Sequence, residues 1–95
     1  MDCSNVKLEK DKATNYYNAT KLVESSHKKD LKEWKTIQNN KDSFMKTVNP
    51  NHDSWRKFSY EKNGSLYVNK DLTYNVAAWV SPEYYMKCYK MMIKK

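Results

Sequence analysis

The single glycine of the chain, Gly64, is the feature that most restricts the fold. It closes a polar stretch, residues 61–64, that separates two runs rich in aromatic and aliphatic residues, 58–60 and 65–68. Glycine readily adopts the positive φ that a tight hairpin turn requires, and the flanking runs favour extended backbone. The sequence therefore predicts strand, turn and strand here, so part of this chain must form a sheet.

Helix-start signals precede this hairpin. Asn18 and Asp30 each stand before apolar residues at helical spacing, and their side-chain oxygens can accept the unpaired N–H groups of a first turn. We expect a first helix that ends near Ser25-Ser26 and a second one over residues 31–40. The expected buried residues of these two helices are Ala19, Leu22, Val23, Leu31, Trp34 and Ile37.

Weaker signals predict the remaining elements. Residues 6–8 and 14–17 are expected to be two short strands, and a third helix should start at Asp42 or Ser43 and end before Pro50. After the hairpin, Asp71 and Ser81 are the expected caps of two C-terminal helices. Four aromatic residues on apolar stripes are expected in the core, namely Trp34, Phe44, Trp79 and Tyr85, and Trp55 is assigned there as well.

The charge of the chain narrows the class of partner. Eighteen Lys and Arg residues against eleven Asp and Glu residues give a formal net charge of +7, which attracts polyanions. The candidates are nucleic acid, an anionic membrane or an acidic protein. All of the basic residues except Arg56 are lysines, whose compact charge suits phosphate contact better than bidentate base recognition.

Catalysis and membrane insertion find little support. Cys3 and Cys88 lie at opposite ends of the chain, and His27 and His52 lack the spacing of a metal site. No apolar run is long enough for a signal-peptide core or a membrane span. We therefore expect an intracellular, reduced protein that is not an enzyme, with no metal, no cofactor and no membrane partner.

Four segments together resemble a known family. They are Tyr17 to Leu22, Leu31 to Trp34, Gly64 to Val68 and Ala78 to Tyr84. In this order and spacing they resemble the KilA-N domain of large DNA viruses and bacteriophages, which is related to the fungal APSES DNA-binding domain. The resemblance covers residues 6–93, nearly the whole chain.

The resemblance implies a small single α+β domain over residues 1–95 that binds DNA. It implies a helix-turn-helix-like pair, here 18–26 and 31–40, a β-hairpin wing over 56–68, and C-terminal packing helices. The turn departs from the family, because Ser25-Ser26-His27-Lys28 stands where glycines are common. A viral origin implies action in an infected host cell. Many family members join this domain to a second one, so the chain is either a stand-alone protein or one domain of a longer protein.

The expected partner is duplex DNA, held largely by lysine–phosphate contacts with modest sequence preference. Amide side chains and the arginine are the candidates for reaching base edges. The DNA-binding residues predicted on the second helix and the wing are Lys28, Lys29, Lys32, Lys35, Gln38, Asn39, Asn40, Arg56, Lys57, Lys62 and Asn63.

Three alternatives remain open at this stage. Lysines at helical spacing are often only a solvated face. If Tyr60 and Tyr67 face outward, they could stack unpaired bases of single-stranded DNA or RNA. The aromatic and methionine-rich helix over residues 84–93 could instead pack on a partner protein or form a homodimer.

Overall fold

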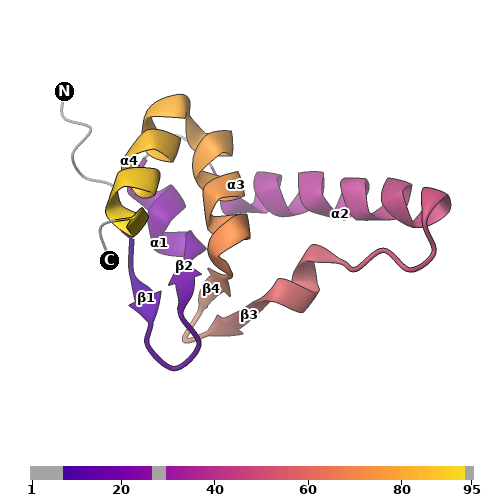
Figure 1. The fold of residues 1–95 in the computed structure, drawn as a ribbon, viewed down its shortest axis with the longest axis horizontal. Helices are drawn as coiled ribbons and strands as arrows, with labels where there is room; N and C mark the ends of the chain where they lie inside the picture. Colours follow the sequence, from indigo (N-terminus) through magenta and orange to yellow (C-terminus); the bar gives the residue numbers. More distant parts are fainter. Residues whose placement is uncertain (1–7, 27–29, 94–95) are drawn as a thin grey trace.

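The computed structural model describes residues 8–26 and 30–93. These residues form an α+β fold in which helices pack with a four-stranded sheet (Figure 1), and the fold class expected from the sequence is confirmed. In chain order the elements are β1 (Lys10–Asp11), β2 (Tyr16–Asn18), α1 (Ala19–Glu24), α2 (Leu31–Val48), the 3-10 helix η2 (Trp55–Phe58), β3 (Ser59–Lys62), β4 (Ser65–Val68), α3 (Lys70–Val80) and α4 (Pro82–Ile93).

The sheet is antiparallel, in the order β1-β2-β4-β3. Between β3 and β4, both Asn63 (φ 53°) and Gly64 (φ 80°) have positive φ, as a two-residue hairpin turn with the twist of its strands requires. The hairpin predicted around Gly64 is therefore confirmed, with a tighter turn than expected. Because β4 also pairs with β2, the predicted wing is the outer half of the sheet.

The first hairpin lies further along the chain than predicted. β1 and β2 are joined by a turn over residues 12–15, whereas residues 6–8 were expected to be the first strand. Val6 lies outside the described residues, and Leu8 is not in a strand. The Asp11 carboxylate accepts the N–H of Ala13 at 3.0 Å, and Asn15 has a φ of 66°. Asp and Asn can form such a turn without an Asn-Gly pair.

Three predicted helix caps are confirmed. Asn18 and Ser81 each accept the backbone N–H three residues further on, at 2.9 and 3.1 Å. Asp30 accepts the N–H two residues further on, at 2.9 Å. α1 also ends where expected, with Ser25 as its C-cap. These signals are local, which is why the sequence alone locates them.

The predicted cap of α3 is wrong by two residues. Asn69 caps this helix, and its carboxamide oxygen accepts the N–H of Leu72 at 2.9 Å. Asp71 already lies in the first turn, where its negative charge faces the positive end of the helix dipole. Asn and Asp are both good caps, and the helix starts at the earlier residue, Asn69.

α2 is one helix of 18 residues, and the predicted interruption near Asn40 is wrong. The polar residues 39–43 contain neither glycine nor proline, so nothing breaks the hydrogen bonds between successive turns. The helix ends at Val48, and its C-cap is Asn49, the residue directly before Pro50. The predicted end before Pro50 is therefore confirmed.

The buried stripe of α2 also differs from the prediction. Trp34 is fully buried and Leu31 is half-buried, but Ile37 is 41% exposed. Each step of three residues falls about 60° short of a full helical turn, so a stripe at i, i+3 and i+6 leaves the core at its third member. Gln38, four residues after Trp34, is buried instead.

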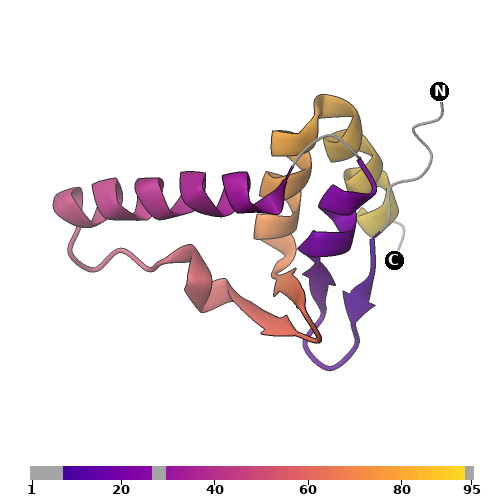
Figure 2. The same cartoon turned by 180° about the vertical axis from the view of Figure 1, so that it is seen from behind.

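The core lies where α1, α3 and α4 meet the sheet, with Trp34 and Trp55 added from α2 and η2. Its buried apolar residues are Ala19, Leu22, Val23, Trp34, Trp55, Leu66, Val68, Val76, Ala77, Cys88 and Met92. Trp79 is partly buried against this cluster. The core assignments of Phe44 (66% exposed) and Tyr85 (39% exposed) are wrong. Phe44 belongs to the second half of α2, and this half projects beyond the sheet and the other helices (Figure 2).

Candidate nucleic-acid interface

α2 and residues 49–58 form an arm that projects from the rest of the molecule, with the second segment running back along the helix (Figures 1 and 2). The arm joins the sheet where η2 continues into β3. It contains most of the residues predicted to contact DNA, so its internal contacts decide which of their side chains remain available.

Asp42 fixes the returning segment to α2. One carboxylate oxygen lies 3.0 Å from Nε2 of His52, and the other accepts from Oγ of Ser54 at 2.7 Å and from the N–H of Trp55 at 3.2 Å. Burial alone would raise the pKa of Asp42, but these hydrogen bonds outweigh it and lower the pKa below its usual value. This carboxylate is therefore charged at neutral pH and is engaged within the arm.

Trp55 is the second anchor of the arm. Its indole N–H donates to the carboxamide oxygen of Asn39 at 2.9 Å, and its ring meets Trp34 edge-on at 5.2 Å between centroids. Burying both indoles gives this junction a large apolar contact. η2 is thereby held against the first half of α2.

Arg56 lies exposed at this junction and is held by two contacts. Its Nη2 donates to the oxygen of Asn39 at 3.3 Å, and its guanidinium lies 5.1 Å from the centroid of the Trp55 ring, within cation–π range. Asn39 was predicted to read a base, but its oxygen accepts from both Trp55 and Arg56. It therefore positions the arginine.

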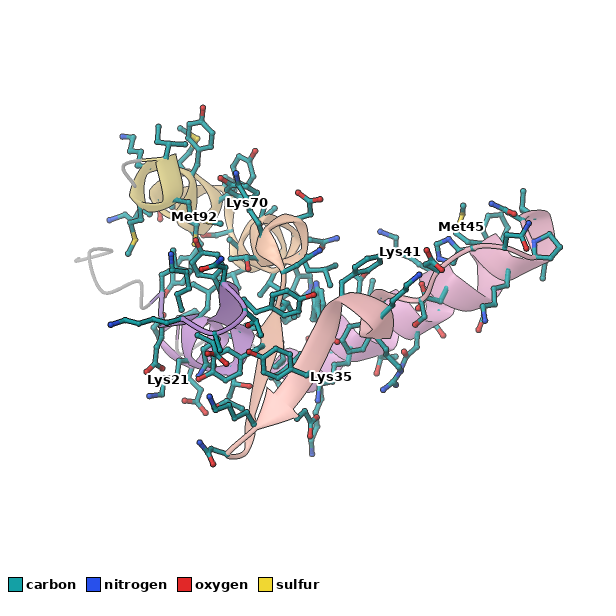
Figure 3. All side chains as sticks on the ribbon, turned by 60° about the horizontal axis from the view of Figure 1, so that its bottom comes forward. Lys21, Lys35, Lys41, Met45, Lys70 and Met92 are labelled. Atoms are coloured by element: carbon teal, nitrogen blue, oxygen red, sulfur yellow. The ribbon has the colours of Figure 1, made fainter. Side chains whose placement is uncertain are left out.

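Lys35 connects α2 directly to the sheet. Its Nζ lies 3.4 Å from the carboxylate of Glu61 on β3, and Figure 3 shows Lys35 beside β3 with Lys41 further out along α2. Together with the Arg56–Asn39 contact, this pair brings the predicted helix and the predicted wing into one surface. The residues joined by these two contacts are 17 and 26 positions apart in the chain, and the sequence gave no information about either contact.

The remaining lysines of the wing also have acidic neighbours. Lys62 lies 3.3 Å from Asp11, and Lys57 lies 3.3 Å from Asp53. The pKa of Asp11 is lowered, first by a hydrogen bond from Tyr60 and then by the N–H of Ala13. These acids reduce the local positive potential relative to what a count of lysines suggests.

The other predicted site residues differ in their exposure. Lys32 and Asn40 are exposed on α2, and Asn63 is exposed in the β3–β4 turn. Gln38 is only 6% exposed, so it cannot reach a base edge in this conformation. Lys28 and Lys29 lie outside the described residues.

Because α2 continues past Asn40, it carries a further basic residue that was not among the predicted site residues. Lys46 is exposed eleven residues after Lys35, which is about three helical turns, so the two lie on the same side of the helix. The signal was available, because no residue between them is a helix breaker.

Three tyrosines form a stack on the sheet. The Tyr60 ring stacks on Tyr16 and on Tyr67, each with centroids 5.4 Å apart. The Tyr60 hydroxyl donates to Asp11 and lies 2.7 Å from the hydroxyl oxygen of Thr14. Its pKa is raised by burial and by this carboxylate. Tyr60 is thus engaged within the protein and joins β3 to the β1–β2 turn.

No group of three or more His, Cys, Asp or Glu residues that could hold a metal ion is found in residues 8–26 and 30–93. Burial raises the pKa of the Cys88 thiol to about 11, which keeps it protonated and unreactive at neutral pH. Within the same ranges, no helix combines the length and apolar character needed to cross a membrane.

Comparison with known proteins gives two matches. The model of the KilA-N domain family matches residues 1–94. A curated protein of Invertebrate iridescent virus 6, described as KilA-N domain-containing protein 313L, is 32% identical over 100 aligned positions, covering 92% of this chain and 27% of the relative. The chain thus spans about a quarter of that relative's length. No solved structure matches. The chain belongs to the KilA-N domain family, which is generally associated with DNA binding.

Proposed function

We propose that this chain binds duplex DNA through one face of the arm and the adjoining edge of the sheet. The main support is the pair of contacts, Lys35 to Glu61 and Arg56 to Asn39, that joins α2 to β3 and η2. The proposed DNA-binding surface consists of Lys32, Lys35, Asn40, Lys46, Arg56, Lys57, Lys62 and Asn63, and Lys28 and Lys29 remain predicted members.

The dimensions of α2 suit a duplex. Lys32 and Lys46 are separated by 14 residues, or about 21 Å at 1.5 Å per residue. Since each strand carries one phosphate per 3.4 Å of helix axis, this side of α2 spans about six base pairs. Lysines along it can therefore contact several phosphates at once.

The ion pairs on this surface do not prevent DNA binding. Lys35 is one-third exposed and Glu61 is well exposed (32% and 68%), and both partners are well exposed in the Lys57–Asp53 pair (62% and 54%). Exposed pairs of this kind contribute only about 0 to 1 kcal/mol. Lys35 and Lys57 can each exchange the carboxylate for a phosphate at little cost, whereas the partner of Lys62, Asp11, is only 9% exposed and also accepts from Tyr60.

The shape of the arm favours phosphate contact over base reading. A major groove about 12 Å wide accommodates one helix of about 10 to 12 Å diameter. Here residues 49–58 lie against α2, so the arm is wider than a single helix. It contacts the groove edges, where the phosphates lie, and Arg56 and Asn40 are the residues of the described arm that remain as candidates for base contact. Sequence preference is therefore modest.

Single-stranded DNA or RNA is the less favoured ligand. Base stacking by Tyr60 would have to displace its contacts with Tyr16, Tyr67 and the Asp11 carboxylate. We propose further that residues 1–95 act as one DNA-binding module without enzymatic activity, in a host cell infected by a virus. The viral relative supports this setting.

Charge reversal on α2 tests the proposed surface. Lys32→Glu combined with Lys35→Glu places two carboxylates against the phosphates, so we expect affinity for a 20-base-pair duplex to fall at least a hundredfold at low salt. Fluorescence anisotropy of a labelled duplex gives the affinities, and circular dichroism verifies the fold. Unchanged affinity in a folded double variant would place the DNA elsewhere.

A control variant with the same change in net charge separates local contact from overall attraction. Lys21→Glu combined with Lys87→Glu alters α1 and α4, outside the proposed surface. We expect this variant to lose much less affinity than the α2 variant. Equal losses would mean that only net charge matters and that α2 has no special role.

A further inference from the structure

Arg56 differs from the lysines near it because its charge has no acidic partner within residues 8–26 and 30–93. Lys35, Lys57 and Lys62 are each paired with a carboxylate. The guanidinium of Arg56 instead contacts an amide oxygen and an aromatic ring, and the residue is exposed. Its positive charge therefore remains available to an outside ligand.

The backbone of Arg56 is fixed on both sides. Its N–H donates to Oγ of Ser54 at 3.2 Å. Its carbonyl oxygen accepts from the backbone N–H of Ser59 and from Oγ of the same residue, the latter at 3.2 Å. The preceding residue, Trp55, is held to α2 through Asp42. The direction in which the arginine side chain leaves the backbone is therefore set before any ligand binds.

The guanidinium is fixed as well. Nη2 donates to the carboxamide oxygen of Asn39, and the indole N–H of Trp55 holds the same oxygen in place at 2.9 Å. The two N–H bonds of Nη2 belong to different edges of the planar fork. The contact with Asn39 therefore occupies one edge and leaves another edge with two parallel N–H donors.

The position of Arg56 on the proposed surface suits a groove. Asn39 lies four residues after Lys35 and seven before Lys46, so the three share one side of α2. Arg56 is bound to Asn39, between the two lysines. When these lysines contact phosphates at the groove edges, the guanidinium lies over the groove itself.

We propose that Arg56 contacts a guanine in the major groove and supplies the base preference of this chain, an inference that rests on the proposed function. Guanine presents two acceptors, N7 and O6, side by side in this groove, which match two parallel donors. Adenine places an amino donor beside its N7, and thymine offers a single acceptor. Asn39 and Trp55 act as positioning residues for the arginine.

The same contacts disfavour the other common use of arginine, insertion into a narrow minor groove. There the side chain would have to extend between two rows of phosphates, away from Trp55 and Asn39. Both contacts would be lost. A guanidinium that stays against Trp55 needs the wider major groove.

Base analogues test which atoms Arg56 contacts. Fluorescence anisotropy compares duplexes of equal length that contain alternating G·C pairs, the same duplex with inosine or 7-deazaguanine in place of guanine, and A·T pairs alone. Inosine keeps N7 and O6 and lacks only the minor-groove amino group, whereas 7-deazaguanine lacks N7. We expect equal affinity for guanine and inosine, several-fold weaker binding of 7-deazaguanine, and about tenfold weaker binding of the A·T duplex.

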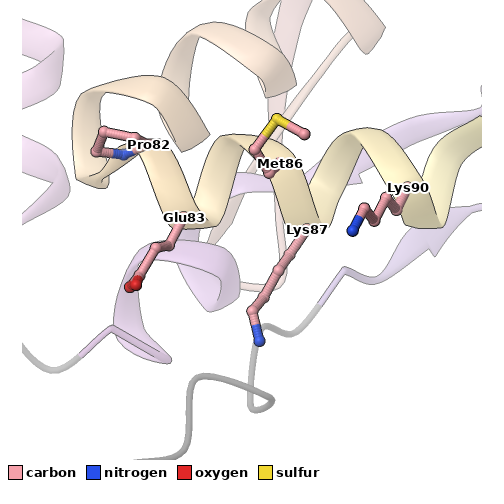
Figure 4. A pocket seen from close by; sticks show the side chains of 5 residues that line it. All are labelled: Pro82, Glu83, Met86, Lys87 and Lys90. Atoms are coloured by element: carbon pink, nitrogen blue, oxygen red, sulfur yellow. The ribbon is translucent and has the colours of Figure 1, made fainter.

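Substitutions assign this preference to Arg56. Arg56→Ala should bind the guanine and 7-deazaguanine duplexes equally. Lys57→Ala removes the same charge from the neighbouring residue, and it should weaken every duplex by one factor and keep the preference. Lys90 lies on α4, beside a shallow surface hollow at the other end of the fold from the arm (Figures 1 and 4), and Lys90→Ala should change neither quantity.

Asn39 variants test the positioning role. Asn39→Ala should reduce the preference for guanine over 7-deazaguanine and leave the affinity for the A·T duplex unchanged. Asn39→Asp keeps an acceptor oxygen for Trp55 and Arg56, so it should retain the preference while its negative charge weakens binding to every duplex. Circular dichroism verifies the fold of each variant.

The failing outcomes separate this inference from the proposed function. A wild-type chain that binds no duplex at low salt overturns both. Duplex binding with equal affinity for guanine and 7-deazaguanine overturns this inference alone. Binding that favours inosine over guanine would place the contact in the minor groove and overturns it, as does a preference that survives in folded Arg56→Ala.

Discussion

At the scale of single residues, several polar side chains position the site and are not free to contact DNA. Asn39 accepts from Trp55 and Arg56, and Asp42 accepts from Ser54 and Trp55. The sequence correctly identifies these as polar residues on a helix. It cannot tell which of them faces the returning segment, because that depends on contacts between residues 12 to 17 positions apart. Residue type alone therefore assigned Asn39 to base reading.

Asp42 makes the stability of the arm dependent on pH. Its pKa in the folded protein is below the usual 3.8, so its stabilising contribution is complete above that value and is lost as pH falls through the lowered pKa. Asp42→Asn should cost about 1 to 3 kcal/mol at pH 7, since it weakens hydrogen bonds to a charged acceptor. Urea unfolding at pH 7 and pH 3 measures the loss.

The pH dependence gives the contradicting result. The difference in unfolding free energy between the wild type and Asp42→Asn should shrink at pH 3. Asp11, whose pKa is also lowered, is present in both proteins, so it contributes equally to the pH dependence of both unfolding free energies. A difference that is the same at both pH values would mean that the charge of Asp42 does not stabilise the arm.

At the scale of elements, local signals predict well and signals between elements predict poorly. The caps at Asn18, Asp30 and Ser81 and the turn at Gly64 are set by neighbouring residues, and all four are confirmed. The length of α2 was underestimated because Asp42 and Ser43 are good caps, which favours the start of a new helix after Asn40. Polar residues continue a helix when no breaker is present and one side remains exposed.

The two halves of α2 should respond differently to mutation. Trp34 is fully buried, so Trp34→Ala should cost about 3 to 5 kcal/mol. Phe44 is 66% exposed in the projecting half, so Phe44→Ser should cost less than about 0.5 kcal/mol. Denaturant unfolding of the two variants gives both values. Comparable losses would show that the outer half of α2 is packed as tightly as the inner half.

At the scale of the whole molecule, the arm and α4 lie at opposite ends of the fold (Figure 1). The sequence predicts the sign of the charge, the fold class and the family, all of which depend on composition or local pattern. It does not predict that acids on β1, β3 and the returning segment lie beside the lysines of the proposed surface. Net charge alone therefore overstates the attraction, and binding relies on where the charges lie.

The salt dependence of duplex binding tests the central claim most directly. Each neutralised phosphate releases bound counterion, and roughly four such contacts predict a slope of about −3 to −4 for log affinity against log salt concentration. Removing two of them with Lys32→Ala and Lys35→Ala should make this slope shallower by about two. Anisotropy titrations of both proteins between about 50 and 200 mM salt, where the effect of salt on affinity is large, measure this slope. The same slope in both proteins, or no duplex binding at low salt, would contradict the account.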